Sequence, residues 1–309
     1  MLYKNWLDEW LSLYVRPSVK EKTYQNYENA ARLYIIPGVG DYELEALTLD
    51  VLQDFVIGLS GEGCGKQGRG LASSSIGLIV TIVQKSLRFA VAIGKSRAQY
   101  SDMIQRPKIV EKRVDCFSVA EQKKIEREIL SQSEDKMLGV LLCLYTGLRI
   151  GELMALTWDD IDLSKHILTV DKTCHDSYEN GKFVKVTSSP KTASSTRIIP
   201  LPKQLTPHLT ALKKKSKNQY VISNREKNVS IRTYQRGFEL LLKKLHIPHR
   251  GFHSLRHTFA TRALECGMDV KTLSEILGHK NPNVTLTRYA HSMMEHKAAM
   301  MNKLGKMLG

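Results

Sequence analysis

The side chains best suited to chemistry gather in one stretch, residues 251–291, whose polar members include His253, Arg256, His257, His279 and Tyr289. Positions three and four apart share one face of a helix, so the first three are expected side by side on one helical turn. Histidines at this spacing could bind zinc, but the HExxH protease pattern requires a glutamate where this chain has Ser254. Cationic and polarisable groups on one face suit a phosphate better than a metal ion.

Two further basic residues, Arg149 and Lys191, lie well upstream. In the segment TGLRIGEL, Gly147 and Gly151 interrupt a helical pattern, and Glu152 could orient the guanidinium of Arg149. Taken alone, this pair is typical of an ordinary ion pair at the end of a surface helix. Lys191 is expected at the tip of a hairpin between two strands, where lysine ordinarily protects a sheet edge. The polar composition of that turn would also let the lysine reach into a groove.

Tyr289, in the run TLTRYAH, would by itself be read as a half-buried packing residue. The joint set suggests more. Attack by a phenol on a phosphodiester needs cations that hold the non-bridging oxygens, an acid for the leaving oxygen and an acceptor for the phenolic proton. Two arginines, a lysine and histidines match these requirements.

Charge and composition restrict the partners. The chain has 309 residues and carries 46 Lys and Arg against 31 Asp and Glu, a formal net charge of +15 that is spread along the sequence. Such an excess favours a polyanion, and nucleic acid in particular. No apolar run approaches the ~20 residues of a membrane span, and Asp8 and Glu9 interrupt what would be a signal peptide. We therefore expect a cytoplasmic protein without a membrane partner.

The five scattered cysteines contain no CxxC pair and predict neither a disulfide framework nor a zinc site.

Hydrophobic periodicity predicts a helical N-terminal domain. Its helices are placed at residues 1–14, 19–35, 48–59 and 73–92, and Pro37, with Gly38 and Gly40, is expected to end the second of them. The periodicity fades after Gly94, and we place an interdomain linker at 105–116.

The second part of the chain mixes two periods. Ser118 and Glu121 form a capping box that opens its first helix. Alternating residues predict three strands, and helical patterns return after them. The strands are placed at 166–170, 182–186 and 196–201, and the helices at 118–130, 137–145, 205–215, 230–245, 253–266 and 270–277. The predicted fold is mainly α with a small antiparallel sheet: a helical domain over 1–104 and an α+β domain over 117–309.

Taken together, these motifs resemble the tyrosine recombinases of the phage-integrase family. The family's six active-site positions are filled in family order, by TGLRIGEL with Arg149, the turn lysine Lys191, HSLRH with His253 and Arg256, LGH with His279, and TRYAH with Tyr289. Residues 23–27 and 36–40 and the helix from Ser73 resemble the family's core-binding domain.

The resemblance implies a SAM-like core-binding domain and a catalytic domain that together form a C-shaped clamp around duplex DNA. It also implies strand cleavage through a 3′-phosphotyrosine, with neither a cofactor nor a metal ion. By this resemblance, Tyr289 would be the nucleophile, and Arg149 and Arg256 would clamp the phosphate. Lys191 would protonate the leaving 5′ oxygen and His253 would assist proton transfer. His279 would hydrogen-bond a non-bridging oxygen.

Family members act as tetramers on two duplexes and exchange strands through a Holliday junction. The expected partners are therefore double-stranded DNA, further copies of this chain, and an excisionase or other accessory factor. The tail after Tyr289 has Met301, Leu304 and Met307 at roughly helical spacing and resembles the C-terminal helix that docks on a neighbouring protomer. Folding back onto its own domain is the other possibility.

The expected function is site-specific recombination of a mobile element, in the bacterial cytoplasm and at the nucleoid when bound to DNA. Two alternatives remain open: DNA relaxation by a type IB topoisomerase, and a catalytically silent DNA-binding protein. The chain starts almost directly in the core-binding helix, without the arm-binding domain of larger integrases. It is therefore expected either to use simple sites or to be a truncated version.

Overall fold

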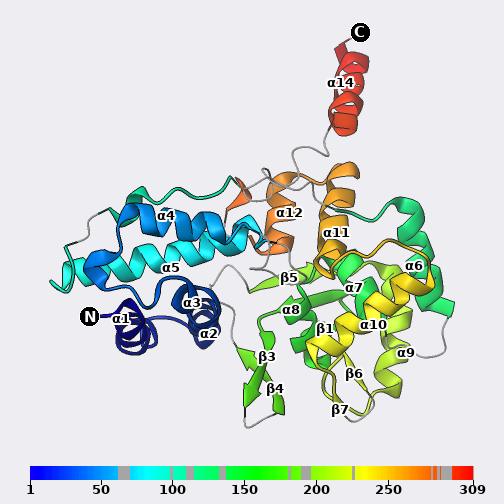
Figure 1. Cartoon of the computed structure of the whole chain (residues 1–309). Coiled ribbons are helices and arrows are strands. Elements are labelled where there is room, and N and C mark those ends of the chain that lie inside the picture. The colour runs from blue at the N-terminus through cyan, green and yellow to red at the C-terminus, as the bar shows by residue number, and fades with distance from the viewer. Residues whose placement is uncertain are drawn as a thin grey trace. The chain divides into compact units, whose positions relative to one another are not determined.

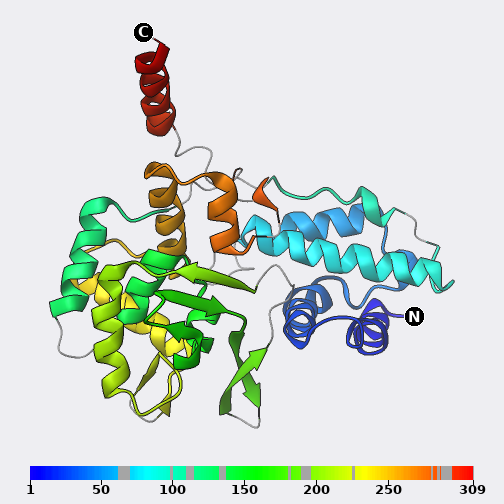
Figure 2. The same cartoon turned by 180° about the vertical axis from the view of Figure 1, so that it is seen from behind.

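The computed structural model describes residues 1–61, 70–97, 100–108, 115–131, 137–179, 182–188, 196–224, 227–279, 281–283, 286 and 294–308. The chain divides into two compact units, Met1–Lys112 and Arg113–Gly309 (Figures 1 and 2). The division falls within the stretch 105–116 that the sequence predicts as a linker. Of the six predicted site residues, Lys191 and Tyr289 lie outside the described residues.

The first unit is helical, and the predicted helices are confirmed. Its helices are α1 (Tyr3–Trp10), α2 (Glu21–Ala30), α3 (Ile36–Val39), α4 (Leu49–Gly58) and α5 (Ser73–Ala92). Thr48 caps α4, since its hydroxyl accepts a hydrogen bond from the backbone N–H of Val51. The core lies between α5 and the earlier helices, where Trp6 and Tyr3 are fully buried. Tyr3 shares a 2.7 Å hydrogen bond with Ser86 on α5.

The second helix continues past Pro37 and Gly38 and ends at Gly40, the last of the three residues that were predicted to end it. A π-helical turn, Ala31–Ile35, extends α2, and the N–H of Ile36 bonds to the carbonyl of Ala31, five residues back. The hydrogen-bond ladder has therefore already shifted by one residue where the proline, which lacks an N–H, enters the helix. The helical run ends at Gly40, whose N–H bonds to the carbonyl of Ile36 at 2.9 Å.

Helix α5 is more apolar than expected. This 20-residue helix contains an 18-residue window with a mean hydropathy of 1.4, so it is long and apolar enough to cross a membrane by length and composition alone. Half of this window is buried in the protein, and Ile76, Val80 and Leu87 belong to the core of the first unit. A buried helix of a folded domain meets the same criterion, so α5 is the central core helix that its periodicity predicts.

The second unit combines helices with short antiparallel strands. The predicted capping box is confirmed, since the N–H of Ser118 donates to Glu121 at 2.7 Å and the N–H of Glu121 donates to the Ser118 hydroxyl at 3.2 Å. The predicted helices are also confirmed, and α7 lies in the main core. The helices are α6 (Val119–Ser131), α7 (Leu138–Thr146), α8 (Ile150–Ala155), α9 (Thr206–Lys215), α10 (Ile231–Lys244), α11 (His253–Glu265), α12 (Val270–Leu277) and α14 (Met294–Leu308).

The small antiparallel sheet is present, but its pairing differs from the prediction. Strands β1 (Ile161–Asp162), β2 (Ile167–Val170) and β5 (Arg197–Pro200) form a sheet in the order β1-β2-β5. Strand β3 (Thr173–Glu179) forms a separate hairpin with β4 (Lys182–Ser188), and β6 (Ser223–Asn224) pairs with β7 (Lys227–Asn228).

The predicted hairpin of β4 with β5 is therefore not formed, because these two strands pair with β3 and β2 respectively. Lys191, which was expected at its tip, lies outside the described residues. The sequence TCHDSYE of β3 does not alternate apolar with polar residues, so this strand was not predicted. Without β3, the strand that follows β4 in the sequence was taken as its hairpin partner.

Candidate active site

Helix α11 presents Arg256 from the interior of the second unit, where the residue is only 2% exposed. Its Nη1 donates to the carbonyl of Gly147 at 2.7 Å, and its Nη2 donates to the carbonyl of Leu277 at 2.7 Å. Nη2 also lies 2.8 Å from Nε2 of His279. Because a guanidinium can only donate, Nε2 of His279 is the acceptor and the imidazole proton is on Nδ1. Arg256 thus joins the turn after α7 to the end of α12.

The turn after α7 brings Arg149 to the same place. Gly147 ends α7 with φ of 68°, a left-handed conformation that favours glycine. A Cβ there would lie 2.5 Å from the ring of Phe259 and 2.7 Å from the side chain of Leu277, so only glycine allows α7 to pack this closely on α11 and α12. Arg149 follows, and its Nη1 donates to the carbonyl of Leu277 at 3.3 Å. The two arginines predicted to clamp phosphate therefore share an acceptor.

Glu152 fixes the orientation of Arg149. This buried carboxylate accepts from Nη1 of Arg149 at 2.8 Å and from its backbone N–H at 3.0 Å. It also accepts two hydrogen bonds from Arg197 of β5. Burial would raise the pKa of Glu152, but hydrogen bonds and charge from Arg197, and then the charge of Arg149, hold this pKa below its usual value. The carboxylate is therefore ionised between two guanidinium groups.

Arg197 was not singled out from the sequence, although a signal was present. It is an arginine on the inward face of a strand, since Arg197 and Ile199 are buried while Ile198 is exposed. Charged residues are rarely buried unless they are paired. An inward-facing arginine in an alternating strand therefore indicates a buried carboxylate partner.

Three guanidinium groups converge on the C-terminal end of α12. Arg197 Nε donates to the carbonyl of Ile276 at 2.5 Å, next to the Leu277 carbonyl that accepts from Arg149 and Arg256. The last carbonyls of a helix have no intrahelical partner and carry partial negative charge, so cations are favoured there. With one carboxylate against three guanidinium groups, the cluster is cationic. Arg149, whose side chain is 38% exposed, connects it to solvent.

The two histidines of α11 lie on one turn, as predicted. The rings of His253 and His257 are 4.5 Å apart at 86°. His253 is exposed at the first turn of α11, one turn before Arg256. The structure thus brings Arg149, Arg256 and His279 together, with His253 on the same helix as Arg256. Within the described part of the chain, no cluster of three or more His, Cys, Asp or Glu side chains could hold a metal ion.

Gly278, which ends α12, is expected to tolerate substitution poorly. Its φ is 63°, and a Cβ there would lie 3.0 Å from Nη1 of Arg197. Gly278→Ala should lower the free energy of unfolding by more than ~1 kcal/mol, because the cost of a left-handed backbone at alanine is increased by the close contact with Arg197. Urea unfolding measures the loss. The control is Gly267→Ala, where φ is 89° and nothing lies within 4 Å of the added carbon. Equal losses in the two variants would mean that the Arg197 contact is unimportant.

Comparison with known proteins shows two family matches. The model of the phage integrase family matches residues 120–296, and that of the phage integrase N-terminal SAM-like domain matches residues 2–60. A tyrosine recombinase XerC-like protein of Caldanaerobacter subterraneus is 29% identical, over 96% of this chain and 80% of that protein. The transposase from transposon Tn916 of Enterococcus faecalis is 32% identical over 54% of this chain, but only 45% of the transposase is covered.

Solved structures share the fold. The Tn1549 transposon integrase in complex with a circular intermediate DNA has a TM-score of 0.80 at 21% identity, covering 98% of this chain and 99% of that one. A lambda integrase tetramer bound to a Holliday junction has a TM-score of 0.68 at 24% identity, covering 91% of this chain and 78% of that one. The predicted fold class, mainly α with small antiparallel sheets, is confirmed by these likenesses.

Proposed function

Because the match over residues 120–296 covers more than half of its length, the chain belongs to the phage integrase family, and we propose that it is a site-specific DNA recombinase of a mobile element. Its curated relatives include a tyrosine recombinase, a transposase and an integrase. The observation that carries the proposal is the convergence of Arg149, Arg256 and His279 at the end of α12.

These three residues form the proposed phosphate site. A guanidinium presents a planar fork of N–H donors that matches phosphate oxygens, and two forks aimed at one place can hold both non-bridging oxygens. Negative charge on these oxygens grows as a nucleophile attacks phosphorus. Donors fixed in these positions therefore stabilise the transition state more than they stabilise the DNA bound before reaction. To His279, whose ring lies against Arg256, we assign the hydrogen bond to a non-bridging oxygen that the family motif implies.

The proposed reaction transfers the phosphodiester to Tyr289. The phenolic oxygen attacks phosphorus, the bond from phosphorus to the 5′ oxygen breaks, and Lys191 gives that oxygen a proton. The phenolic proton passes to a base, a role that we assign to His253. The products are a 3′-phosphotyrosine and a 5′-hydroxyl, and attack by a 5′-hydroxyl of another strand reverses the steps. One phosphate ester is exchanged for another at each step, so the energy of the broken bond is kept in the phosphotyrosine and no ATP is consumed. For Lys191 and Tyr289, these roles rest on the family motifs.

A nicked suicide duplex that carries the junction of the candidate mobile element tests this proposal. The protein should form a covalent adduct that survives detergent, and only on its own site. Binding should weaken steeply with salt, because many phosphate contacts are expected. A type IB topoisomerase would instead relax any supercoiled plasmid. A silent DNA-binding protein would bind the junction without an adduct, and either result would contradict recombination.

We also propose that four copies act together on two duplexes and exchange their C-terminal helices. The support is the exposed apolar surface of α14, whose large side chains Met301, Leu304, Met307 and Leu308 are 65%, 44%, 81% and 77% exposed. Such a surface on one short helix is unfavourable in water, and flexible methionines adapt to a partner surface. A neighbouring protomer would bury it.

Replacing Met301 and Met307 by glutamine is expected to weaken assembly on DNA. Analytical ultracentrifugation of the complex should show the four-copy species decreasing, while cleavage of an isolated site changes less. Asn302→Gln with Lys306→Gln is the matched control, because these exposed residues belong to the same helix but are polar. Persistence of the four-copy complex in the methionine variant would count against helix exchange.

We further propose that an excisionase or other accessory factor sets the direction of the reaction. We also propose that the protein acts in the bacterial cytoplasm and joins the nucleoid when it binds DNA. The relatives from transposon Tn916 of Enterococcus faecalis and from ICEBs1 of Bacillus subtilis support a bacterial mobile element as the setting.

A further inference from the structure

Arg197 is a buried guanidinium to which the proposed chemistry gives no role. Only 6% of its side chain is exposed. Its Nη2 and Nη1 donate to the two carboxylate oxygens of Glu152 at 2.8 and 3.2 Å, and its Nε donates to the carbonyl of Ile276 at 2.5 Å. One side chain of β5 thus ties α8 to the last turn of α12.

Stability alone does not account for this arrangement. Removing two charges from water costs about as much as their attraction returns, and well-packed apolar residues often serve equally well. The pair does supply orientation, because a guanidinium fork holds a carboxylate in one plane. The carboxylate of Glu152, fixed in this way by Arg197, accepts at Oε1 from the side chain of Arg149 and at Oε2 from its backbone N–H.

A second connection runs through α12. Ile276, which accepts from Arg197, is followed by Leu277, whose carbonyl accepts from both Arg149 and Arg256. The chain then turns at Gly278, where a Cβ would lie 3.0 Å from Arg197 Nη1, and continues to His279. The Arg197 guanidinium therefore packs directly against the turn that presents His279.

We propose that Arg197 is a positioning residue for the DNA cleavage site, aligning Arg149 through Glu152 and the turn before His279 through Ile276. It acts without touching DNA. The kinetic consequence rests on the proposed function, whereas the alignment of Arg149 is a property of the protein without DNA. The two can therefore be tested separately.

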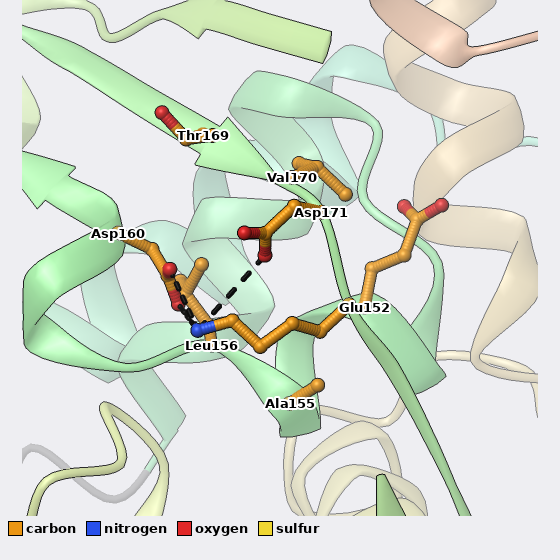
Figure 3. Close-up of a pocket in the computed structure, with 8 residues that line it drawn as sticks. Glu152, Ala155, Leu156, Asp160, Thr169, Val170 and Asp171 are labelled. Carbon is orange, nitrogen blue, oxygen red and sulfur yellow. Dashed lines mark hydrogen bonds and ion pairs between the residues drawn. The ribbon is translucent and has the colours of Figure 1, made fainter. Parts of the chain in front are cut away.

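The kinetic test compares Arg197→Met, Arg197→Lys and a control, Lys172→Met. Lys172 lies 2.8 Å from Asp160, whose side chain is 9% exposed, so its loss also leaves a buried carboxylate without its cation. Lys172 and Glu152 line one pocket, but Lys172 pairs with Asp160 and Asp171, and the carboxylate of Glu152 points away from both (Figure 3). Single-turnover adduct formation on the nicked duplex should fall roughly 100-fold in Arg197→Met, the loss expected for a misplacement of about 1 Å. Arg197→Lys should be intermediate and Lys172→Met close to the wild type.

A double-mutant cycle separates positioning from general destabilisation. Because Arg197 acts partly through Arg149, combining Arg197→Met with Arg149→Lys should lose less than the sum of the two single losses, and the part that remains is the contribution through Ile276. Independent structural damage would instead add. Additive losses would overturn the proposal.

The second readout needs no DNA. The guanidinium signal of Arg149 in ¹⁵N-resolved NMR should be sharp in the wild type and in Lys172→Met, and broadened or shifted in Arg197→Met. An unchanged signal would overturn the proposal. If the wild type forms no adduct, recombination fails as the function, and the NMR comparison still decides the role of Arg197. If Arg197→Met does not fold, Arg197→Lys carries the same comparison, because the single nitrogen of a lysine cannot occupy the three positions from which Nε, Nη1 and Nη2 of Arg197 bond to Ile276 and to both oxygens of Glu152.

Discussion

Tyr289→Phe is expected to abolish the covalent adduct on a nicked duplex while DNA affinity stays within about twofold, because the substitution removes only the attacking oxygen. Adduct formation is read on a denaturing gel, and affinity by fluorescence anisotropy at the same salt concentration. The control is Tyr220→Phe, a half-buried tyrosine of the same unit whose ring contacts Lys185. This variant should cleave like the wild type.

Two results would contradict the assignment of Tyr289. An adduct that persists in Tyr289→Phe would place the nucleophile elsewhere. Loss of the adduct in Tyr220→Phe as well would show that cleavage is sensitive to any change of this kind. Loss of binding in Tyr289→Phe would leave the phenylalanine variant uninformative about chemistry, so mass spectrometry of the wild-type adduct should identify the modified residue directly.

Arg256→Lys should have the second largest effect, slowing cleavage by roughly 100-fold to 1,000-fold, as loss of a donor at a developing charge does elsewhere. A lysine has one nitrogen, which cannot occupy both the Nη1 position that bonds to Gly147 and the Nη2 position that lies against Leu277 and His279. The buried carbonyl of Gly147 would also lose its guanidinium partner, at a cost of about 1–3 kcal/mol in the free energy of unfolding. Single-turnover kinetics and urea unfolding measure the two effects.

Arg262→Lys is the matched control for Arg256→Lys. Arg262 belongs to the same helix, its Nη2 donates to the carbonyl of Phe117 at 2.9 Å, and its Nη1 pairs with Glu265. The variant should lose some stability and keep its cleavage rate. If both variants slow cleavage equally, the Arg256 effect comes from damage to α11 rather than from the phosphate site.

Local features were predictable because their causes are local. The capping box at Ser118 and the period of α5 depend on residues within a few positions, and the structure has these features where they were predicted. The continuation of the second helix past Pro37 was not predicted, because a π-helical turn depends on packing that periodicity does not report. The pairing of β4 was misjudged because β3 lacks the alternation that marks a strand.

The candidate site divides in the same way. The sequence by itself determined which residue types are available and in which order, and family motifs assigned Lys191 and Tyr289, whose roles stay predictions. Only the tertiary structure decided that Arg149 and Arg256 share the carbonyl of Leu277, and that Arg197 supports Glu152 from 45 residues away. The physical reason is that a buried guanidinium must find acceptors wherever the fold leaves them. Those acceptors are the last carbonyls of α12, and nothing in the residues around either arginine specifies that helix end.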